Sequence, residues 1–416
     1  MTRRPGWRAL RLDDTLPMLV QGYAWLPDRR RAAGRRTVRT RLMGRQALGV
    51  EGPAGARFVD DEDHVRRSGT LPEPVVSTLF GHGSVHSLDG EAHRVRKALF
   101  VDLLTGDGVA ALVDSVTAAW DDAVRRWAGQ RQVVLVDEAS RVLTRGVCDW
   151  AGVPVCDEEV PALARDLTAL VDGFATGAPR HWRARRVRQR REAWLAQLVE
   201  GVRRGTGPVP AGSVVDVVSR HRDSEGELLE PRLAAVEVLN VLRPTVAVCW
   251  FVAFAAHSLH RWPDSRERLR SGDTAFATAF AHEVRRFYPF APFIGGRTPR
   301  EVQWDGETVP AGSLVLLDLF GQNHDPELWE EPYAFRPERF LDRPIGAWEL
   351  VPQGAGDPRT GHRCPGEDVT VALLSALAVR LARLEYVLPE QDLSISLRSI
   401  PARPASRVVL TGVRPG

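Results

Sequence analysis

The sequence "QGAGDPRTGHRCPGE", residues 353–367, runs from a glycine-rich segment into a single cysteine and then into an apolar helical pattern. Because Pro365 and Gly366 follow Cys364 directly, we expect the cysteine at the N-terminal end of a helix. Exposed amide groups and the helix dipole at that end favour the thiolate over the thiol. A thiolate in this position can bind iron. From this segment alone, a buried free cysteine in a loop is the alternative interpretation.

The composition describes a large, ordered protein with little overall charge. Of the 416 residues, 44% are apolar, which is enough for a large core. The net charge of +3 gives no strong case for a nucleic acid or an acidic membrane as partner. The four cysteines have neither metal-finger nor disulfide-framework spacing, and the N-terminal segment lacks the apolar core of a signal peptide. We therefore expect a cytoplasmic protein without a membrane anchor.

Apolar residues at three- and four-residue steps predict that most of the chain is helical. These patterns cover residues 109–129, 160–174, 184–205, 274–288 and 369–388, together with a long helix that begins near Pro231. Strand patterns are short and lie at 36–52, 300–319 and 406–413. The basic run at 180–191 continues into an amphipathic segment, which predicts a solvated helix face rather than a nucleic-acid surface. The predicted fold class is mainly α with a minor β-sheet part.

The long central helix contains an unexpected pair of residues, Arg243 and Pro244, within "LRPTVAV" at 242–248. A proline in a helix interior removes a hydrogen bond and costs roughly 3 kcal/mol. Burial of an unpaired guanidinium costs more still. Penalties of this kind concentrate where function requires them, so the pair predicts a functional site in the middle of this helix.

Two further motifs precede the cysteine in the chain. In "HEVRR", residues 282–286, Glu283 and Arg286 are an acid and a base on one helix face, and Arg339 in "FRPERF", residues 335–340, is able to complete a buried network with them. In this order, the two motifs and the cysteine loop resemble the cytochrome P450 superfamily. The resemblance implies one cytochrome P450 domain over residues 1–416, with a large helical part and a minor β-sheet part around haem b. It also implies that Cys364 binds the haem iron as the axial thiolate.

Departures from the common pattern indicate a particular branch of this superfamily. Asp357 and Thr360 stand where common P450s have phenylalanine and glycine, and the central helix lacks the acid–alcohol pair that delivers protons to dioxygen. Thr245 has no acid before it, so we do not interpret it as the missing alcohol. The segments "RPTVAV", "APRHW", "QGAGD" and "HRCPGE" together resemble the bacterial fatty-acid peroxygenases, which include hydroxylases and alkene-forming decarboxylases.

The resemblance to this branch implies roles for three residues. Arg243 holds the substrate carboxylate through two parallel hydrogen bonds, and this carboxylate acts as acid and base toward hydrogen peroxide, so no dedicated redox partner is required. Pro244 is expected to open the helix above the haem. Oxidation of a long-chain fatty acid at the α or β carbon then gives a hydroxy acid or, with loss of carbon dioxide, a terminal alkene. His86 stands where alkene-forming relatives have histidine and favours decarboxylation; a packed or propionate-bound histidine is the alternative.

The resemblance also indicates residues that surround the cofactor and the substrate. The predicted haem contacts, besides Cys364, are His362, Lys97, His93, Arg96 and Gln353. The predicted acyl-chain contacts are Phe80, Phe174, Phe290 and Phe293. Two other functions stay open. One is a reductase-dependent monooxygenase for a bulkier substrate, in which Arg243 is a structural ion-pair partner, and the other is a non-catalytic haem-thiolate protein that binds fatty acids.

Overall fold

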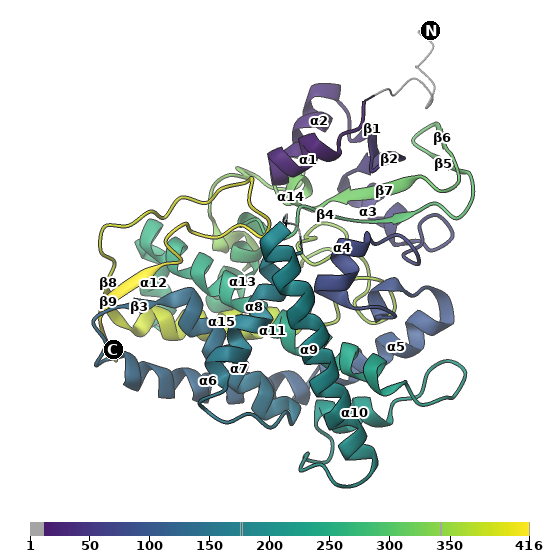
Figure 1. Cartoon of the computed structure of the whole chain (residues 1–416). Coiled ribbons are helices and arrows are strands. Elements are labelled where there is room, and N and C mark those ends of the chain that lie inside the picture. Colours follow the sequence, from purple (N-terminus) through teal and green to yellow (C-terminus); the bar gives the residue numbers. More distant parts are fainter. Residues whose placement is uncertain (1–11, 175, 177, 342, 416) are drawn as a thin grey trace.

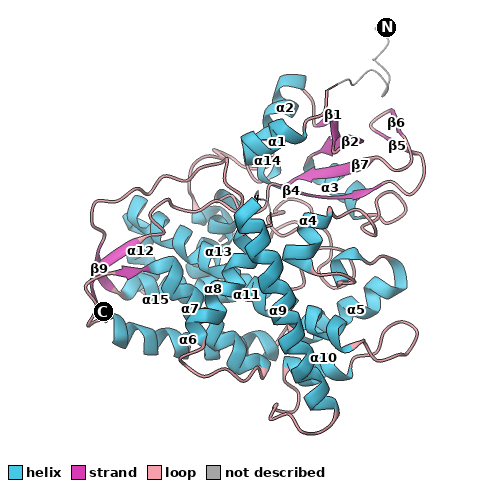
Figure 2. Cartoon of the chain, viewed as in Figure 1, coloured by secondary structure: helices cyan, strands magenta, loops and turns pink. Residues whose placement is uncertain are grey.

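The computed structural model describes residues 12–415 except 175, 177 and 342. A large bundle of helices forms most of the molecule, and a small four-stranded sheet lies at the end nearer the described N-terminal residues (Figure 1; Figure 2). The prediction of a mainly helical fold with a minor β-sheet part is confirmed. The first eleven residues, which carry part of the basic N-terminal segment, lie outside the described residues.

The helical bundle is built from seven long helices that contribute most of the apolar core. They are α6 (Asp107–Trp127), α7 (Leu135–Ala151), α8 (Val160–Asp172), α9 (Ala178–Arg203), α11 (Pro231–Arg261), α13 (Thr274–Phe287) and α15 (Glu367–Arg383). The other α-helices are α1 (Thr15–Gln21), α2 (Trp25–Ala33), α3 (Gly52–Asp60), α4 (Glu73–Val75), α5 (Gly90–Leu103), α10 (Val214–Arg220), α12 (Pro263–Arg270) and α14 (Leu319–Gln322). Single turns of other helix types are η2 (Gly22–Ala24), η3 (Val76–Phe80), η4 (Val85–Ser87) and η5 (Pro337–Phe340).

The main sheet has the strand order β1-β2-β7-β4, with only the β2–β7 pair parallel. Its strands are β1 (Thr37–Leu42), β2 (Arg45–Val50), β7 (Leu314–Asp318) and β4 (Phe293–Arg297). Two small sheets contain β3 (Val133–Val134), β9 (Val409–Arg414) and β8 (Glu385–Val387), and β5 (Val302–Trp304) with β6 (Glu307–Val309). The sheet therefore joins the N-terminal part of the chain to the segment that follows α13.

Helix α11 runs through the centre of the bundle and packs against α7, α8, α9 and α15. It is long and apolar enough to cross a membrane, yet 94% of its most apolar window is buried inside the protein, as in the core helix of a globular fold. Every residue from Ala234 to Ala256 is buried except Pro244, which is exposed. Because Pro244 lies in the middle of a buried helix, its exposed surface marks an open space inside the protein.

The prediction that Pro244 opens the helix is wrong. Helix α11 is continuous from Pro231 to Arg261. Only the hydrogen bond that the missing N–H would have donated is lost at this position. The hydroxyl of Thr245 donates to the carbonyl of Val241 at 2.9 Å, so this side chain is used within the helix itself. Packing on nearly all sides holds the helix together, and the ring of Pro244 borders the open space without widening it.

The sequence missed one long helix and extended another too far. Helix α7 was not predicted, because its first residues continue the strand-like run of β3. The predicted helix at 369–388 ends at Arg383, and the residues that follow form β8. The other predicted helices and strands are confirmed, with ends shifted by a few residues.

Candidate active site

Cys364 lies in a tight loop directly before α15, as its sequence context predicts. Its amide donates to the carbonyl of Gln353 at 3.1 Å, which closes the loop. Gly356 is required there: its φ is +92°, and a Cβ atom would come within 2.3 Å of the Asp60 carboxylate. Burial raises the pKa of the Cys364 thiol, although the Gly366 amide and Lys97 favour the thiolate. The helix end thus favours the thiolate, as its sequence context predicts, but burial opposes it, and a bound metal ion would deprotonate this sulfur.

Arg243 is a buried cation without a carboxylate partner among the described residues. Arg243 is only 6% exposed. Its Nη2 donates weakly to Asn240 Oδ1 at 3.4 Å, and its Nε has no hydrogen-bond partner. Burial, together with the nearby charge of Arg188, lowers the pKa of Arg243 to about 9, although Cys364 acts in the opposite direction. The site around Arg243 therefore lacks an anion, and a carboxylate is the group whose geometry matches a guanidinium.

His86 and Phe80 lie beside Arg243. The rings of Phe80 and His86 have centroids 4.1 Å apart, and the guanidinium carbon of Arg243 is 5.6 Å from the centroid of the Phe80 ring. His86 Nδ1 is buried and has no hydrogen-bond partner in the described structure. Burial lowers the pKa of His86 well below its ordinary value, helped by the charges of Arg243 and Lys97. The imidazole is therefore neutral, with one nitrogen able to donate and the other able to accept.

Arg188 fixes the turn that carries Phe80, and the sequence did not identify it. The guanidinium donates to the carbonyls of Leu79 and Phe80, each at 2.7 Å, and to Glu192 at 2.6 Å. The turn is the π-helical η3, and such turns are frequent at functional sites. Gly81 ends it with a φ of +86°, and a Cβ atom there would lie 2.3 Å from the Arg188 side chain. The predicted solvated face of α9 is thus interrupted by one buried arginine.

The residues around Cys364 fit haem b. Five buried nitrogen atoms that lack a hydrogen-bond partner belong to the predicted site residues and to Arg67: Arg67 Nη1, His86 Nδ1, His93 Nδ1, Arg96 Nε and Arg243 Nε. Unpaired buried donors are costly, so they call for an anionic or polar group. Haem b brings two propionate carboxylates and an iron that takes a thiolate. The open space at Pro244, the thiol of Cys364 and these donors match such a group.

The predicted propionate contacts differ in their surroundings. Lys97 donates to the carbonyl of Arg363, next to Cys364, so it lies at the expected place. Arg96 pairs through Nη1 with the buried Glu237 at 2.8 Å, whereas its Nε has no hydrogen-bond partner, so its contact with the haem stays a prediction. The buried Arg67, with its unpaired Nη1, was missed by the sequence.

His362 and His93 are stacked with ring centroids 4.0 Å apart. His362 Nε2 lies 3.0 Å from Glu62 and 3.7 Å from Asp89, two carboxylates that the sequence did not indicate. Burial lowers the pKa of His362 to about 3 and that of His93 to about 4, so both rings are neutral. His93 Nδ1 lies 4.0 Å from the same Glu62 carboxylate, so both rings adjoin one carboxylate, and the contact of each with the haem stays a prediction.

Of the four predicted acyl-chain residues, the structure brings only Phe80 into contact with Arg243. Phe290 packs against Phe251 of α11, with ring centroids 5.0 Å apart. Phe174 is partly buried against the helical core. Phe293 is part of β4, is only partly buried and packs against Trp25 in the core of the sheet part, and its place beside the acyl chain stays a prediction.

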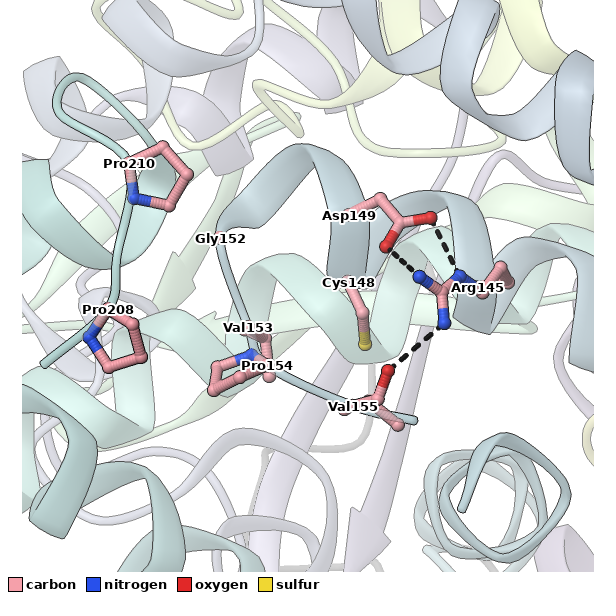
Figure 3. Close-up of a pocket in the computed structure, with 9 residues that line it drawn as sticks. All are labelled: Arg145, Cys148, Asp149, Gly152, Val153, Pro154, Val155, Pro208 and Pro210. Atoms are coloured by element: carbon pink, nitrogen blue, oxygen red, sulfur yellow. Dashed lines mark hydrogen bonds and ion pairs between the residues drawn. The ribbon is translucent and has the colours of Figure 1, made fainter. Parts of the chain in front are cut away.

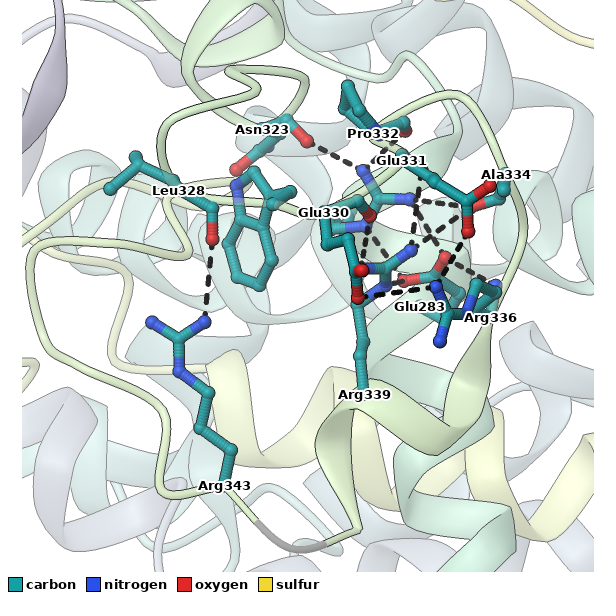
Figure 4. Close-up of polar contacts among 12 residues, drawn as sticks. Glu283, Asn323, Leu328, Glu330, Glu331, Pro332, Ala334, Arg336, Arg339 and Arg343 are labelled. Atoms are coloured by element: carbon teal, nitrogen blue, oxygen red, sulfur yellow. Dashed lines mark hydrogen bonds and ion pairs between the residues drawn. The ribbon is translucent and has the colours of Figure 1, made fainter.

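The predicted Glu–Arg–Arg network is present and buried (Figure 4). Glu283 and Arg286 form an ion pair at 2.7 Å with both side chains fully buried, and Arg339 Nε lies 3.2 Å from the Glu283 carboxylate. Arg286 also donates to the carbonyls of Asn323 and Pro332, each at 2.8 Å. The network therefore ties α13 to the loop that leads to Cys364.

A separate small pocket of about 200 Å³ lies between the end of α7 and the loop at Pro208 and Pro210 (Figure 3). Arg145 is held there by Asp149, and burial raises the pKa of the Cys148 thiol to about 12. None of the predicted site residues lines it. It carries no chemistry that we connect with Cys364.

Comparisons with known proteins agree with this geometry. The sequence profile "Cytochrome P450" matches residues 272–385, which include Glu283, Arg339 and Cys364. Curated relatives include "Cytochrome P450 4e5, mitochondrial" of Drosophila mettleri, 30% identical over 164 residues, which are 35% of this chain and 31% of that protein. The chain thus matches less than a third of the length of that relative. "Putative cytochrome P450 137" of Mycobacterium tuberculosis is 24% identical over 79% of this chain and 73% of its own length.

Solved structures match over nearly the whole chain. Cytochrome P450SP alpha (CYP152B1) in complex with (R)-ibuprophen is 38% identical, with a TM-score of 0.94, over 97% of this chain and 100% of that chain. Cytochrome P450EX alpha (CYP152N1) with myristic acid is 36% identical, with a TM-score of 0.94, over 97% and 98% of the two chains. A variant of cytochrome P450 OleT in complex with arachidonic acid is 33% identical, with a TM-score of 0.95, over 98% of each. The chain belongs to the cytochrome P450 family of oxidoreductases, in the branch of these three enzymes.

Proposed function

We propose that the protein is a cytoplasmic peroxygenase that uses hydrogen peroxide to oxidise long-chain fatty acids at the α or β carbon, giving hydroxy fatty acids, terminal alkenes or both. The observation that carries the proposal is the buried guanidinium of Arg243, which has no carboxylate partner among the described residues and lies beside the open space at Pro244. Two similar structures contain fatty acids, myristic acid in P450EX alpha and arachidonic acid in OleT.

Arg243 binds the substrate carboxylate. A planar guanidinium holds a carboxylate through two parallel hydrogen bonds, and exclusion of water strengthens the pair. Arg188 adds a second positive charge, which is near enough to lower the pKa of Arg243. Asn240 accepts a hydrogen bond from Arg243 and donates to the carbonyl of Phe80 at 2.9 Å. Asn240 therefore links Arg243, the carboxylate clamp, to the turn that carries Phe80.

Cys364 would hold haem iron, and Lys97, Arg67 and His93 would face the propionates. The haem supplies the oxidising chemistry once peroxide is split. Because α11 offers no acid–alcohol pair and Thr245 Oγ1 bonds to its own helix, the carboxylate held by Arg243 takes a proton from hydrogen peroxide and returns it to the distal oxygen. No reductase is needed, because hydrogen peroxide is dioxygen already reduced by the two electrons that a reductase would supply.

The clamp also determines where oxidation occurs. With its carboxylate fixed at Arg243, the fatty acid presents only its first methylenes to the reacting centre. The neutral His86, stacked on Phe80, supplies an N–H donor within the same group of side chains. Its position favours decarboxylation, and a mixture of alkene and hydroxy acid is expected.

Replacement of His86 by glutamine is expected to shift the products from alkene toward hydroxy acid. Glutamine keeps a polar group beside Phe80 but removes the imidazole. The measurement is the alkene-to-hydroxy-acid ratio from myristic acid. His82 is an exposed histidine of the same loop, and His82→Gln should leave the ratio unchanged. Equal ratios in the wild type and both variants would remove His86 from the product-determining step.

The oxidant is tested by supplying each electron source separately. Purified haem-loaded protein is incubated with myristic acid and either hydrogen peroxide or NADPH with a ferredoxin and its reductase. We expect turnover with peroxide alone. Turnover only with the reductase would identify a conventional monooxygenase, and binding of the fatty acid without turnover in either mixture would identify a fatty-acid-binding protein.

A further inference from the structure

The side chain of Gln353 lies directly against the sulfur of Cys364. Its Nε2 is 3.6 Å from Cys364 Sγ and 3.1 Å from Thr370 Oγ1, and its Oε1 accepts from Arg285 Nε at 3.0 Å. An arginine can only donate, so the amide oxygen must face Arg285. The amide N–H groups then necessarily face Thr370 and the sulfur.

Arg285 is itself held in place on three sides. It is 1% exposed, pairs with the carboxylate of Glu367, and contacts His282 Nδ1 at 3.1 Å. Glu367 also accepts from Arg363 Nη2 at 2.8 Å. A chain of buried polar contacts thus runs from Arg363 through Glu367 and Arg285 to Gln353.

The two adjacent arginines of "HEVRR" therefore serve different sites. Arg286 pairs with Glu283 and ties α13 to the loop before Cys364, whereas Arg285 points to Gln353 and Glu367. Only Arg286 is explained by the Glu–Arg–Arg network. Arg285 lies outside that network, and its Nε fixes the orientation of the Gln353 amide.

We infer that Gln353, oriented by Arg285, is a positioning residue that tunes the axial thiolate through an N–H···S hydrogen bond. A donor at the sulfur stabilises its negative charge and withdraws electron density from the metal, and hydrogen bonds to metal-bound sulfur set reduction potentials. The inference rests on Cys364 as haem ligand and does not depend on the fatty acid. It can therefore fail or hold independently of the proposed substrate.

The test uses the haem-loaded Gln353→Met variant, which keeps the side-chain length but removes the donor. Three properties are measured: the Fe(III)/Fe(II) midpoint potential, the Soret wavelength of the ferrous carbon monoxide complex and the Fe–S stretching frequency. We expect the midpoint potential to become more negative by about 59 mV, which corresponds to about a tenfold change in the one-electron equilibrium constant. The Soret band should move to longer wavelength, and the Fe–S stretching frequency should rise. Gln353→Glu, which also lacks the N–H donors, should shift the potential in the same direction.

Gln391→Met is the matched control. Gln391 is also partly buried and bonded through both amide atoms, to Val409 and Ser406 in the C-terminal region. The Gln391→Met variant should leave the midpoint potential, the Soret wavelength and the Fe–S stretching frequency unchanged. Wild-type potential and spectra in Gln353→Met with full haem content would overturn the inference. Loss of haem from both Gln353 variants would overturn it as well, because Gln353 would then serve retention of the cofactor rather than tuning of the sulfur.

Discussion

Replacement of Arg243 by alanine is expected to reduce fatty-acid turnover by at least about a hundredfold while the haem spectrum stays intact. Each hydrogen bond to a charged group contributes roughly 1.5–3 kcal/mol, and two of them would be lost. A loss of about 3 kcal/mol corresponds to about a hundredfold in kcat/KM. The measurement is kcat/KM for myristic acid with hydrogen peroxide, together with the Soret spectrum.

The effect should be specific to the clamp. Arg261, at the exposed end of the same helix, provides the control, and Arg261→Ala should keep wild-type activity. Arg243→Lys should recover only part of the activity, because an ammonium group lacks the planar fork. An alanine variant at Arg243 with wild-type kcat/KM would show that the guanidinium does not bind the substrate.

Replacement of Glu283 by alanine is expected to lower the free energy of unfolding by roughly 3–5 kcal/mol, because it leaves buried arginines without their anion. Glu283 pairs with Arg286 at 2.7 Å and lies 3.2 Å from Arg339, and it also accepts from the amide of Arg336 at 2.7 Å. Loss of these contacts loosens the segment that leads to Cys364. The measurements are denaturant unfolding and haem content of the purified variant.

A nearby carboxylate offers a matched comparison. Glu338 lies in η5, is exposed, and pairs with the partly exposed Arg268 at 3.1 Å. Surface pairs of this kind contribute about 0–1 kcal/mol, so Glu338→Ala should be nearly as stable as the wild type. Equal stability of the Glu283 and Glu338 variants would mean that the buried network is not what holds this segment.

The candidate residues that stand out in the sequence are those that break a local rule or belong to a fixed motif. A cysteine after a glycine-rich segment, and an arginine inside an apolar helix, stand out without any knowledge of the fold. Cys364 and Arg243 could therefore be found from the sequence. Their spatial relation to His86 could not, because it depends on the packing of η3 against α11.

Arg188 shows why other site residues were missed. It lies in a run of arginines that looks uniformly solvated, and such runs are usually exposed. A signal was present: Arg188 shares one helix face with Ala184, Val187 and Leu195, which are buried. An arginine on an apolar stripe indicates a buried contact, here with the carbonyls of Leu79 and Phe80.

Pro244 shows the limit of local rules in the opposite direction. The sequence predicts a disrupted helix at this residue, whereas α11 continues through it. The loss of one hydrogen bond is small compared with the packing of a helix buried from Ala234 to Ala256 apart from Pro244. Tertiary packing therefore overrides the local preference, and the helix is continuous through Pro244.

The central claim is that the substrate carboxylate at Arg243 is required for the reaction. It is tested most directly by product analysis of the purified protein with hydrogen peroxide and no reductase, using myristic acid and, in parallel, methyl myristate. We predict α- or β-hydroxy acids, or the terminal alkene with one carbon fewer, from the acid and no products from the ester. Equal oxidation of the ester, or oxidation of the acid far from its carboxylate, would contradict the account.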